Sequence, residues 1–311
     1  MPDTDDLDFT APGPASAPPA APAAPAAPSA PFKAASSPFY RPEVAERIFQ
    51  FAGKAERFEA GQQVFAEDAK ASAGGLFSRK GATRMYYLAE GEVALSIGGR
   101  PLDTVGKGEV FGEMAVISER PRSASATAKT ACAALSLDAD QLRVALGAMP
   151  EFALMLMSVM FDRLRFIAAR LSTRKTAIAV REAQAPVFDA ALLAQLEGAL
   201  PRPMLARHRA GTVIMREGQA GMVMYVVKSG RVVISLGERA VEVVGAGGTF
   251  GEMALVDQSP RLANAHADEE CELLAIDRAS LLAAVKQQPA FAMAMLRSIA
   301  DRLRHMNAQL G

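Results

Sequence analysis

The sequence predicts an α+β fold, mainly β, made of two similar domains that are each a small antiparallel barrel or sandwich with flanking helices. Short runs rich in Val, Ile and Tyr alternate with glycines, as in TVIM, MVMYVVKSG and RVVISLG. Such runs are typical of antiparallel strands joined by tight turns. Amphipathic stretches precede and follow the strands and predict the helices. The same plan occurs twice along the chain.

An internal duplication is the clearest feature of the chain. The segment from Gly108 to Ala128 reappears from Gly247 to Ala267, at an offset of 139 residues (247 less 108). The same offset pairs Tyr86 with Tyr225, Gly91 with Gly230, Cys132 with Cys271, Asp138 with Asp277, Pro150 with Pro289, and the two DRLR tetrapeptides that begin at Asp162 and Asp301. A repeat at fixed spacing indicates one structural unit used twice.

We therefore predict a tail over residues 1–38, a first domain over 39–183 and a second domain over 184–311. The tail is almost entirely Ala, Pro and Ser after an acidic start, a composition with too little apolar bulk to fold. It is expected to be a tether, with a Pro-rich docking peptide as the alternative. Before Tyr86 the first copy is about ten residues longer than the second, which predicts a longer surface loop.

Each copy opens and closes with predicted helices. A short helix is expected from Glu43 to Gly53, and Asp189 is a plausible N-cap of its counterpart. The closing helices carry apolar stripes at Phe152, Leu156, Met160, Leu164, Ile167 and Leu171, and at Phe291, Met295, Ile299, Leu303, Met306 and Leu310. Each stripe packs either on its own barrel or in a helix pair between domains or subunits. The first closing helix is expected to run on through Val180 toward Pro186.

Composition limits the function classes. The 34 basic and 34 acidic residues cancel, which argues against a dedicated nucleic-acid or anionic-membrane surface. No apolar run approaches the roughly 20 residues of a membrane helix, and the acidic N-terminus resembles no targeting signal, so a cytoplasmic protein is expected. The two cysteines occupy equivalent strand positions and are predicted to be free core thiols. The three histidines are scattered, so no metal site is expected.

The duplicated segment has the chemistry of a nucleotide site. Gly112 and Gly251 each precede a glutamate and a short helical stretch, where glycine lets the backbone approach a ligand and exposed amides attract an anion. Arg122 and Arg261 follow nine residues after the glutamates (122 less 113; 261 less 252) and can bind phosphate oxygens. A glutamate beside a phosphate suits a sugar hydroxyl that donates to it. Phosphate and sugar hydroxyl together indicate a nucleotide.

FGEMA followed by Pro-Arg at this spacing, in a glycine-punctuated barrel closed by helices, resembles the phosphate-binding cassette of the cyclic nucleotide-binding domain family. The resemblance extends over nearly the whole chain from about Glu43 and occurs twice. It implies two barrels of the double-stranded β-helix or jelly-roll type, with the Glu on the ribose 2′-hydroxyl, the Arg on the cyclic phosphate and cassette amides lining the phosphate. The predicted ligand-binding residues are Gly112, Glu113, Met114, Ala115, Arg122, Ser123, Gly251, Glu252, Met253, Ala254, Arg261 and Leu262.

The resemblance implies a non-enzymatic sensor that binds cAMP and uses no cofactor or metal. Leu262 favours cAMP at the second site, whereas Ser123 leaves cAMP and cGMP open at the first. Val116 and Leu255 match the apolar contact by which the cassette reports to its lid helix. The expected partners are the cyclic nucleotide, a protein effector of unknown identity and, through the lid helices, a second copy of the chain.

Other outputs of this family are not expected here. The sequence after the second stripe holds no helix-turn-helix, so direct DNA binding is not expected. No paired arginines of a kinase pseudosubstrate occur in the tail, and the basic segment Thr173–Ala179 is interpreted as a solvated helix end. The alternative function is a ligand-independent interaction module that uses the Pro-rich tail and the helix stripes.

Overall fold

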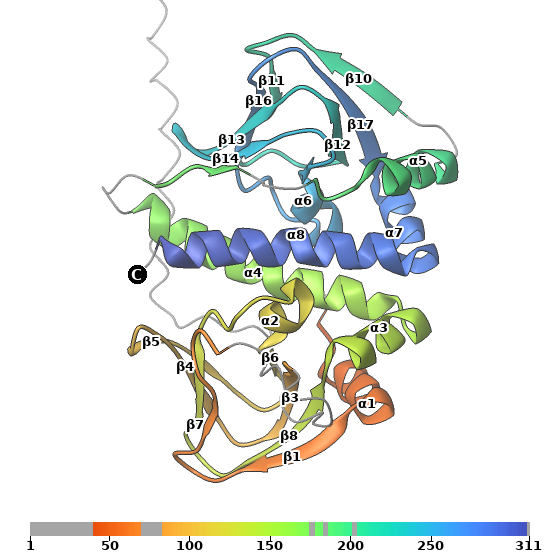
Figure 1. The fold of residues 1–311 in the computed structure, drawn as a ribbon. Coiled ribbons are helices and arrows are strands. Elements are labelled where there is room, and N and C mark those ends of the chain that lie inside the picture. The colour runs from red at the N-terminus through yellow and green to blue at the C-terminus, as the bar shows by residue number, and fades with distance from the viewer. Residues whose placement is uncertain (1–39, 70–82, 174–177, 183–185, 201–203, 310–311) are drawn as a thin grey trace, which may run out of the picture.

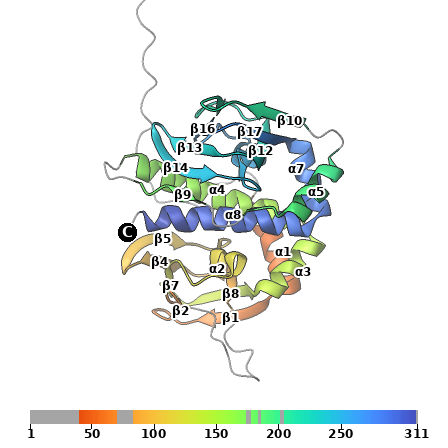
Figure 2. The same ribbon diagram turned by 45° about the horizontal axis from the view of Figure 1, so that its top comes forward.

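The computed structural model describes residues 40–69, 83–173, 178–182, 186–200 and 204–309. Two domains of the same architecture lie on opposite sides of a central layer of two long helices, α4 and α8 (Figure 1). Each domain holds two sheets whose strands pair antiparallel, apart from one short parallel strand at the edge of the second domain, and short helices lie at the end where the long helices begin (Figures 1 and 2). The sheet-and-helix fold predicted from the sequence, with its duplication, is confirmed.

The first domain contains two four-stranded sheets, of order β1-β8-β3-β6 and β2-β7-β4-β5. Its strands are β1 (Lys54–Phe58), β2 (Gln63–Phe65), β3 (Met85–Glu90), β4 (Val93–Ile97), β5 (Arg100–Val105), β6 (Val110–Phe111), β7 (Ser125–Ala128) and β8 (Cys132–Leu137). Its helices are α1 (Pro42–Ala52), α2 (Glu113–Ser118), α3 (Ala139–Ala148) and α4 (Glu151–Ser172).

The second domain repeats this order, with sheets β10-β17-β12-β15 and β11-β16-β13-β14-β9. Its strands are β9 (Arg181–Glu182), β10 (Met204–His208), β11 (Val213–Met215), β12 (Val223–Ser229), β13 (Val232–Leu236), β14 (Arg239–Val244), β15 (Thr249–Phe250), β16 (Asn264–Ala267) and β17 (Cys271–Asp277). Its helices are α5 (Ala190–Ala199), α6 (Glu252–Asp257), α7 (Arg278–Gln287) and α8 (Pro289–Ala308). Asp189 caps α5 as predicted, since its carboxylate accepts the amide of Leu192 at 2.8 Å.

The registers of the two domains match. Tyr86 on β3 lies opposite Phe111 on β6, and Tyr225 on β12 lies opposite Phe250 on β15. The rings of each pair stack at a centroid distance of 5.1 Å. Because β6 and β15 lead directly into α2 and α6, these pairs fix where the two cassettes begin.

The lid helices form the centre of the molecule. α4 and α8 lie side by side, and both run from the end that carries α3 and α7 toward the C-terminal end (Figure 1). One hydrophobic core cluster takes in residues of α1, α3 and α4 together with residues of α7 and α8. The described residues of the apolar stripes are buried, except Met306, which is half-buried. The stripes therefore serve a helix pair between domains as well as the packing onto each barrel.

One predicted element is wrong. α4 ends at Ser172, with Thr173 as its C-cap, and does not continue to Val180. Residues 178–180 are irregular and Arg181–Glu182 form β9, which pairs in parallel with β14 of the second domain. An ion pair between Arg181 and Glu242 accompanies this pairing. Residues 181–182 gain backbone hydrogen bonds to the edge of β14 and an ion pair with the buried Glu242. These interactions outweigh the weak tendency of a helix end to extend by itself.

Other predictions from the sequence can be compared with the structure. Cys132 and Cys271 are buried free thiols, as predicted. No single helix among the described residues has the length and apolarity to cross a membrane; α3 and α4 meet that test only together, across a bend of 118°. The predicted tail, most of the predicted loop before Tyr86 and Leu310 lie outside the described residues.

Candidate functional site

Each cassette begins at a glycine that the geometry requires. Gly112 is the N-cap of α2 with φ 74°, and Gly251 is the N-cap of α6 with φ 81°. This left-handed conformation disfavours any residue with a Cβ atom. A Cβ atom on Gly112 would also lie 2.9 Å from Nη1 of Arg122, and one on Gly251 would lie 2.6 Å from Nη1 of Arg261. The glycines therefore permit the arginines to pack against the start of the cassette.

Arg122 and Arg261 are buried cations, 6% and 7% exposed. Arg122 donates to the carbonyl oxygens of Gly112 (2.9 Å) and Arg84 (2.6 Å), and its guanidinium lies 3.9 Å from the ring centre of Phe65. Arg261 donates in the same way to Gly251 and Val223. Burial lowers the pKa of both arginines. Among the described residues neither has a carboxylate at ion-pair distance, so both sites suit an anionic ligand.

Glu113 and Glu252 are almost fully buried, at 1% and 2% exposure. In the first site Oε1 of Glu113 forms an ion pair with Arg163 of α4. In the second site Oε1 of Glu252 pairs with Nη1 of Arg302 of α8 at 2.5 Å. The other oxygen, Oε2, has no hydrogen-bond partner among the described residues in either glutamate. A buried carboxylate oxygen in this state is suited to accept a hydrogen bond from a ligand hydroxyl.

The second site has a more extended ion-pair network than the first. Glu242 on β14 pairs with Arg302 at 3.0 Å and with Arg181. Burial disfavours the charge of Arg302, but Glu242 and Glu252 outweigh it and raise its pKa. The equivalent of Glu242 in the first domain is Asp103 (242 less 139), whose pKa is raised by burial, an effect that the amide of Thr104 and the charge of Arg163 only partly offset.

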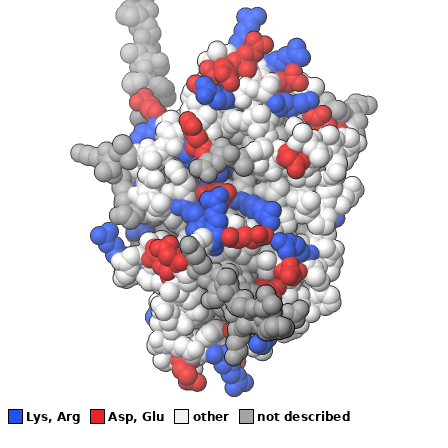
Figure 3. Space-filling view, in the orientation of Figure 1, with Lys and Arg blue, Asp and Glu red and all other residues white. Residues whose placement is uncertain are grey.

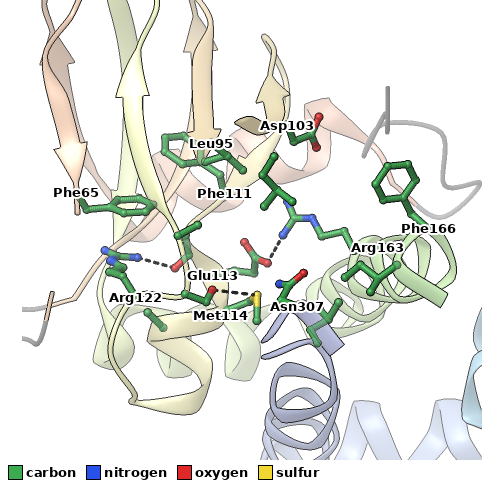
Figure 4. Close-up of a pocket in the computed structure, with 17 residues that line it drawn as sticks. Phe65, Leu95, Asp103, Phe111, Glu113, Met114, Arg122, Arg163, Phe166 and Asn307 are labelled. Atoms are coloured by element: carbon green, nitrogen blue, oxygen red, sulfur yellow. Dashed lines mark hydrogen bonds and ion pairs between the residues drawn. The ribbon is translucent and has the colours of Figure 1, made fainter. Parts of the chain in front are cut away.

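Most of these groups line a hollow in each domain, and Figure 4 shows the hollow of the first domain. The volumes, open mouths included, are about 740 Å³ in the first domain and about 650 Å³ in the second. In Figure 4 Arg122 approaches from the cassette side and Arg163 from α4, with Glu113 between them. Each hollow is completed by the other domain: Leu303 and Asn307 of α8 reach the first, and Leu164 of α4 reaches the second.

All the predicted site residues line the hollows, six in each. The first is lined by Gly112, Glu113, Met114, Ala115, Arg122 and Ser123, and the second by Gly251, Glu252, Met253, Ala254, Arg261 and Leu262. Ser123 Oγ lies 3.7 Å from Sδ of Met114. The described residues contain no group of three or more His, Cys, Asp or Glu that could hold a metal ion.

Sequence reasoning missed the lid arginines Arg163 and Arg302 and the residues contributed across the domain boundary. The duplicated DRLR tetrapeptide was the available signal, because both lid arginines belong to it. It could not be interpreted without knowing which way the helix faces. The cross-domain residues depend on the packing of α4 against α8, which no local pattern specifies.

Two duplicated, cassette-bearing hollows define a protein with two related ligand-binding domains. Residues 55–147 and 205–288 match the model of the cyclic nucleotide-binding domain, and together these spans are more than half of the chain. The chain therefore belongs to the cyclic nucleotide-binding domain family and carries two copies of that domain.

Individual relatives match parts of the chain. The cyclic AMP receptor protein of Thermus thermophilus is 38% identical over 105 residues, 32% of this chain and 49% of the relative. A cGMP-dependent protein kinase of Eimeria tenella is 29% identical over 66% of this chain and 19% of the relative. The solved catabolite activator protein of Thermus thermophilus is 34% identical, covers 40% of this chain and 62% of its own, and has a TM-score of 0.36. This chain thus spans half or less of these two curated relatives.

Proposed function

We propose that this protein is a non-enzymatic cyclic nucleotide sensor in which each domain binds one nucleotide between its cassette and its lid helix. The observation that carries the proposal is that each hollow holds a buried arginine and a buried glutamate, where, within the described part of the chain, the arginine has no carboxylate partner and one glutamate oxygen has no hydrogen-bond partner. A phosphate beside a ribose hydroxyl satisfies both groups at once.

In this proposal the cyclic phosphate binds Arg122 or Arg261, and the ribose 2′-hydroxyl donates to Oε2 of Glu113 or Glu252. cAMP is the proposed ligand of the second site, because Leu262 offers no polar contact to a guanine amino group. At the first site Ser123 is compatible with cAMP or cGMP. The regulated partner is proposed to be a protein that responds to the positions of α4 and α8.

Ligand binding is expected to act on the lid helices through the glutamates. The Oε1 atom of each glutamate already binds a lid arginine, so a ligand at Oε2 changes the charge environment of that ion pair. Val116 and Leu255 pack in the same core cluster as α4 and α8, and they give the cassette helices a second, apolar contact with the lids. A ligand shifts these helices only as far as it binds one arrangement more tightly than another.

The arginines provide the test. Arg122→Ala and Arg261→Ala are each expected to lose about 2 to 5 kcal/mol of cAMP binding at their own site, because the phosphate then lies buried without a counter-charge. Titration calorimetry on each variant should still show one tight event from the other domain. Arg57→Ala, which removes an exposed charge on β1, serves as the control and should bind as the parent does.

Thermal shift with cAMP, cGMP and AMP separates the sensor from the alternative, a ligand-independent interaction module. A ligand at 100 times its dissociation constant should stabilise the protein by about 2.7 kcal/mol. No shift with cAMP or cGMP, or unchanged binding in both arginine variants, would overturn the proposed sites.

A further inference from the structure

The two arginines of each DRLR tetrapeptide contact different domains, and the proposed function above does not involve the second arginine. Their first arginines, Arg163 and Arg302, each bind the cassette glutamate of their own domain. Their second arginines, Arg165 and Arg304, lie two residues further along the same helices and reach the opposite domain. One turn of each lid helix therefore contacts both cassettes.

Arg165 of α4 binds the far end of the second cassette. Its guanidinium forms a two-pronged ion pair with the carboxylate of Asp257, the last residue of α6, with Nη2 at 3.1 Å from Oδ1. It also donates to the hydroxyl of Ser259, just beyond α6. The Asp257 side chain is 5% exposed and that of Arg165 is 24% exposed, so water screens this pair only partly.

Arg304 of α8 makes the reciprocal contact with the first cassette. It donates to the carbonyl oxygen of Pro121 at 2.9 Å and to the hydroxyl of Ser118 at 3.2 Å. Ser118 is the last residue of α2 and the equivalent of Asp257 (257 less 139). The two contacts are thus related by the duplication, but only the one on the second cassette is an ion pair.

Other groups around these contacts also cross the domain boundary. Arg297 of α8 donates to the carbonyl oxygen of Ile117 and binds Glu119 at 2.9 Å, and Arg120 lies 3.6 Å from Asp301. Basic and acidic side chains gather across the middle of the face in Figure 3, at the level of α4 and α8 in Figure 1. The cassettes are therefore held from across the domain boundary, at the ends opposite their glycines.

We propose that Arg165 and Arg304 are positioning residues that couple the two nucleotide sites, each by holding the end of the other domain's cassette helix. This rests on the proposed function. A ligand that alters the Glu113–Arg163 pair displaces α4, and Arg165 moves with it because the two arginines are only two positions apart on one rigid helix. The displacement reaches α6 directly through Asp257. Coupling between sites is reciprocal, so the second site acts on the first through the same contacts.

The test compares the affinity of one site when the other is competent and when it is disabled. Site-two affinity for cAMP is measured by calorimetry in the parent and in Arg122→Ala, and the ratio gives the coupling factor. We expect a factor of about 5 to 150 in the parent, the usual range for coupled sites. Arg165→Met should bring the factor close to one. Asp257→Ser, which copies the residue of the first domain, should reduce it in the same way, and the double variant should have no further effect.

Lys286→Met is the matched control, since Lys286 forms an exposed ion pair with Glu151 of α4 across the same boundary, at 3.2 Å and away from both cassettes. It should leave the coupling factor unchanged. A parent that binds no nucleotide would overturn the proposed function itself. If both sites bind nucleotide but the coupling factor of the parent is one, this inference alone is overturned. The same holds if the coupling factor keeps its parent value in both Arg165→Met and Asp257→Ser.

Discussion

At the scale of single residues, each site contains charged side chains that the protein itself buries, without a ligand. Glu113 and Glu252 keep one oxygen on a lid arginine and the other unpartnered within the described residues. Arg122 and Arg261 are held by backbone carbonyls rather than by carboxylates. Burying such groups costs free energy, and their presence in both domains supports the proposal that they bind a ligand.

The cassette glycines give a residue-scale prediction. Gly112→Ala should destabilise the protein, because φ is 74° there, and should weaken the first site about tenfold or more, roughly 1.4 kcal/mol, because the new methyl displaces Arg122. Gly61→Ala is the control, since Gly61 has φ 82° and nothing within 4 Å of its Cβ position.

The control should lose about 1 kcal/mol of stability from the left-handed backbone alone and bind nucleotide as the parent does. Melting curves and calorimetry on both variants separate backbone strain from displacement of the arginine. Equal nucleotide affinity in Gly112→Ala and Gly61→Ala would contradict the prediction.

At the scale of elements, caps and turns define where the helices begin. Asp138 starts α3 with a capping box, in which its carboxylate accepts the amide of Gln141 while the Gln141 side chain accepts the amide of Asp138. Asp277 starts α7 at the equivalent position by accepting the amide of Ser280 at 2.8 Å. The capping aspartates thus fix the starts of α3 and α7, the helices that precede the two lid helices.

The cap on α7 predicts a pH dependence. Asp277→Ala should lower the free energy of unfolding by about 1 kcal/mol at pH 7. The hydrogen bonds from Ser280 lower the pKa of Asp277 below its usual value of 3.8. A lowered acid pKa stabilises the fold above the unfolded value and loses this effect as pH falls through the folded value.

The difference between parent and Asp277→Ala should therefore be full at pH 7 and shrink below about pH 4. Urea unfolding at pH 7, 5 and 3.5 measures it. Glu238→Ala, in the exposed turn between β13 and β14, is the control and should show little difference at any pH. A deficit for Asp277→Ala that grows on acidification would contradict the assignment.

At the scale of the whole molecule, the two domains share one core. The cluster that packs α4 against α8 also takes in α1, α3 and α7, and each hollow is lined in part by the other domain. The domains are therefore not independent units joined by a linker. Their arrangement resembles a dimer made within one chain, with α4 and α8 as equivalent helices.

Splitting the chain tests this arrangement. A fragment of residues 39–183 exposes the side of α4 that packs on α8, where residues such as Leu164 are buried in the intact protein. We expect it to melt several degrees below the full chain, or to form a dimer through α4. The intact protein should unfold in a single transition by calorimetry. A fragment that is monomeric by light scattering and melts at the same temperature as the parent by calorimetry would contradict a shared core.

The sequence by itself determined the features that depend on local spacing. Glycine-punctuated apolar runs specified the strands, the 139-residue offset specified two equivalent domains, and the spacing of Gly112, Glu113 and Arg122 specified a site whose members the structure brings together. Only the tertiary structure decided that α4 ends at Ser172 and that Arg165 and Arg304 cross to the opposite cassettes. The physical reason is that periodicity fixes which face of a helix is apolar, whereas its partner is chosen by packing between segments far apart in the chain.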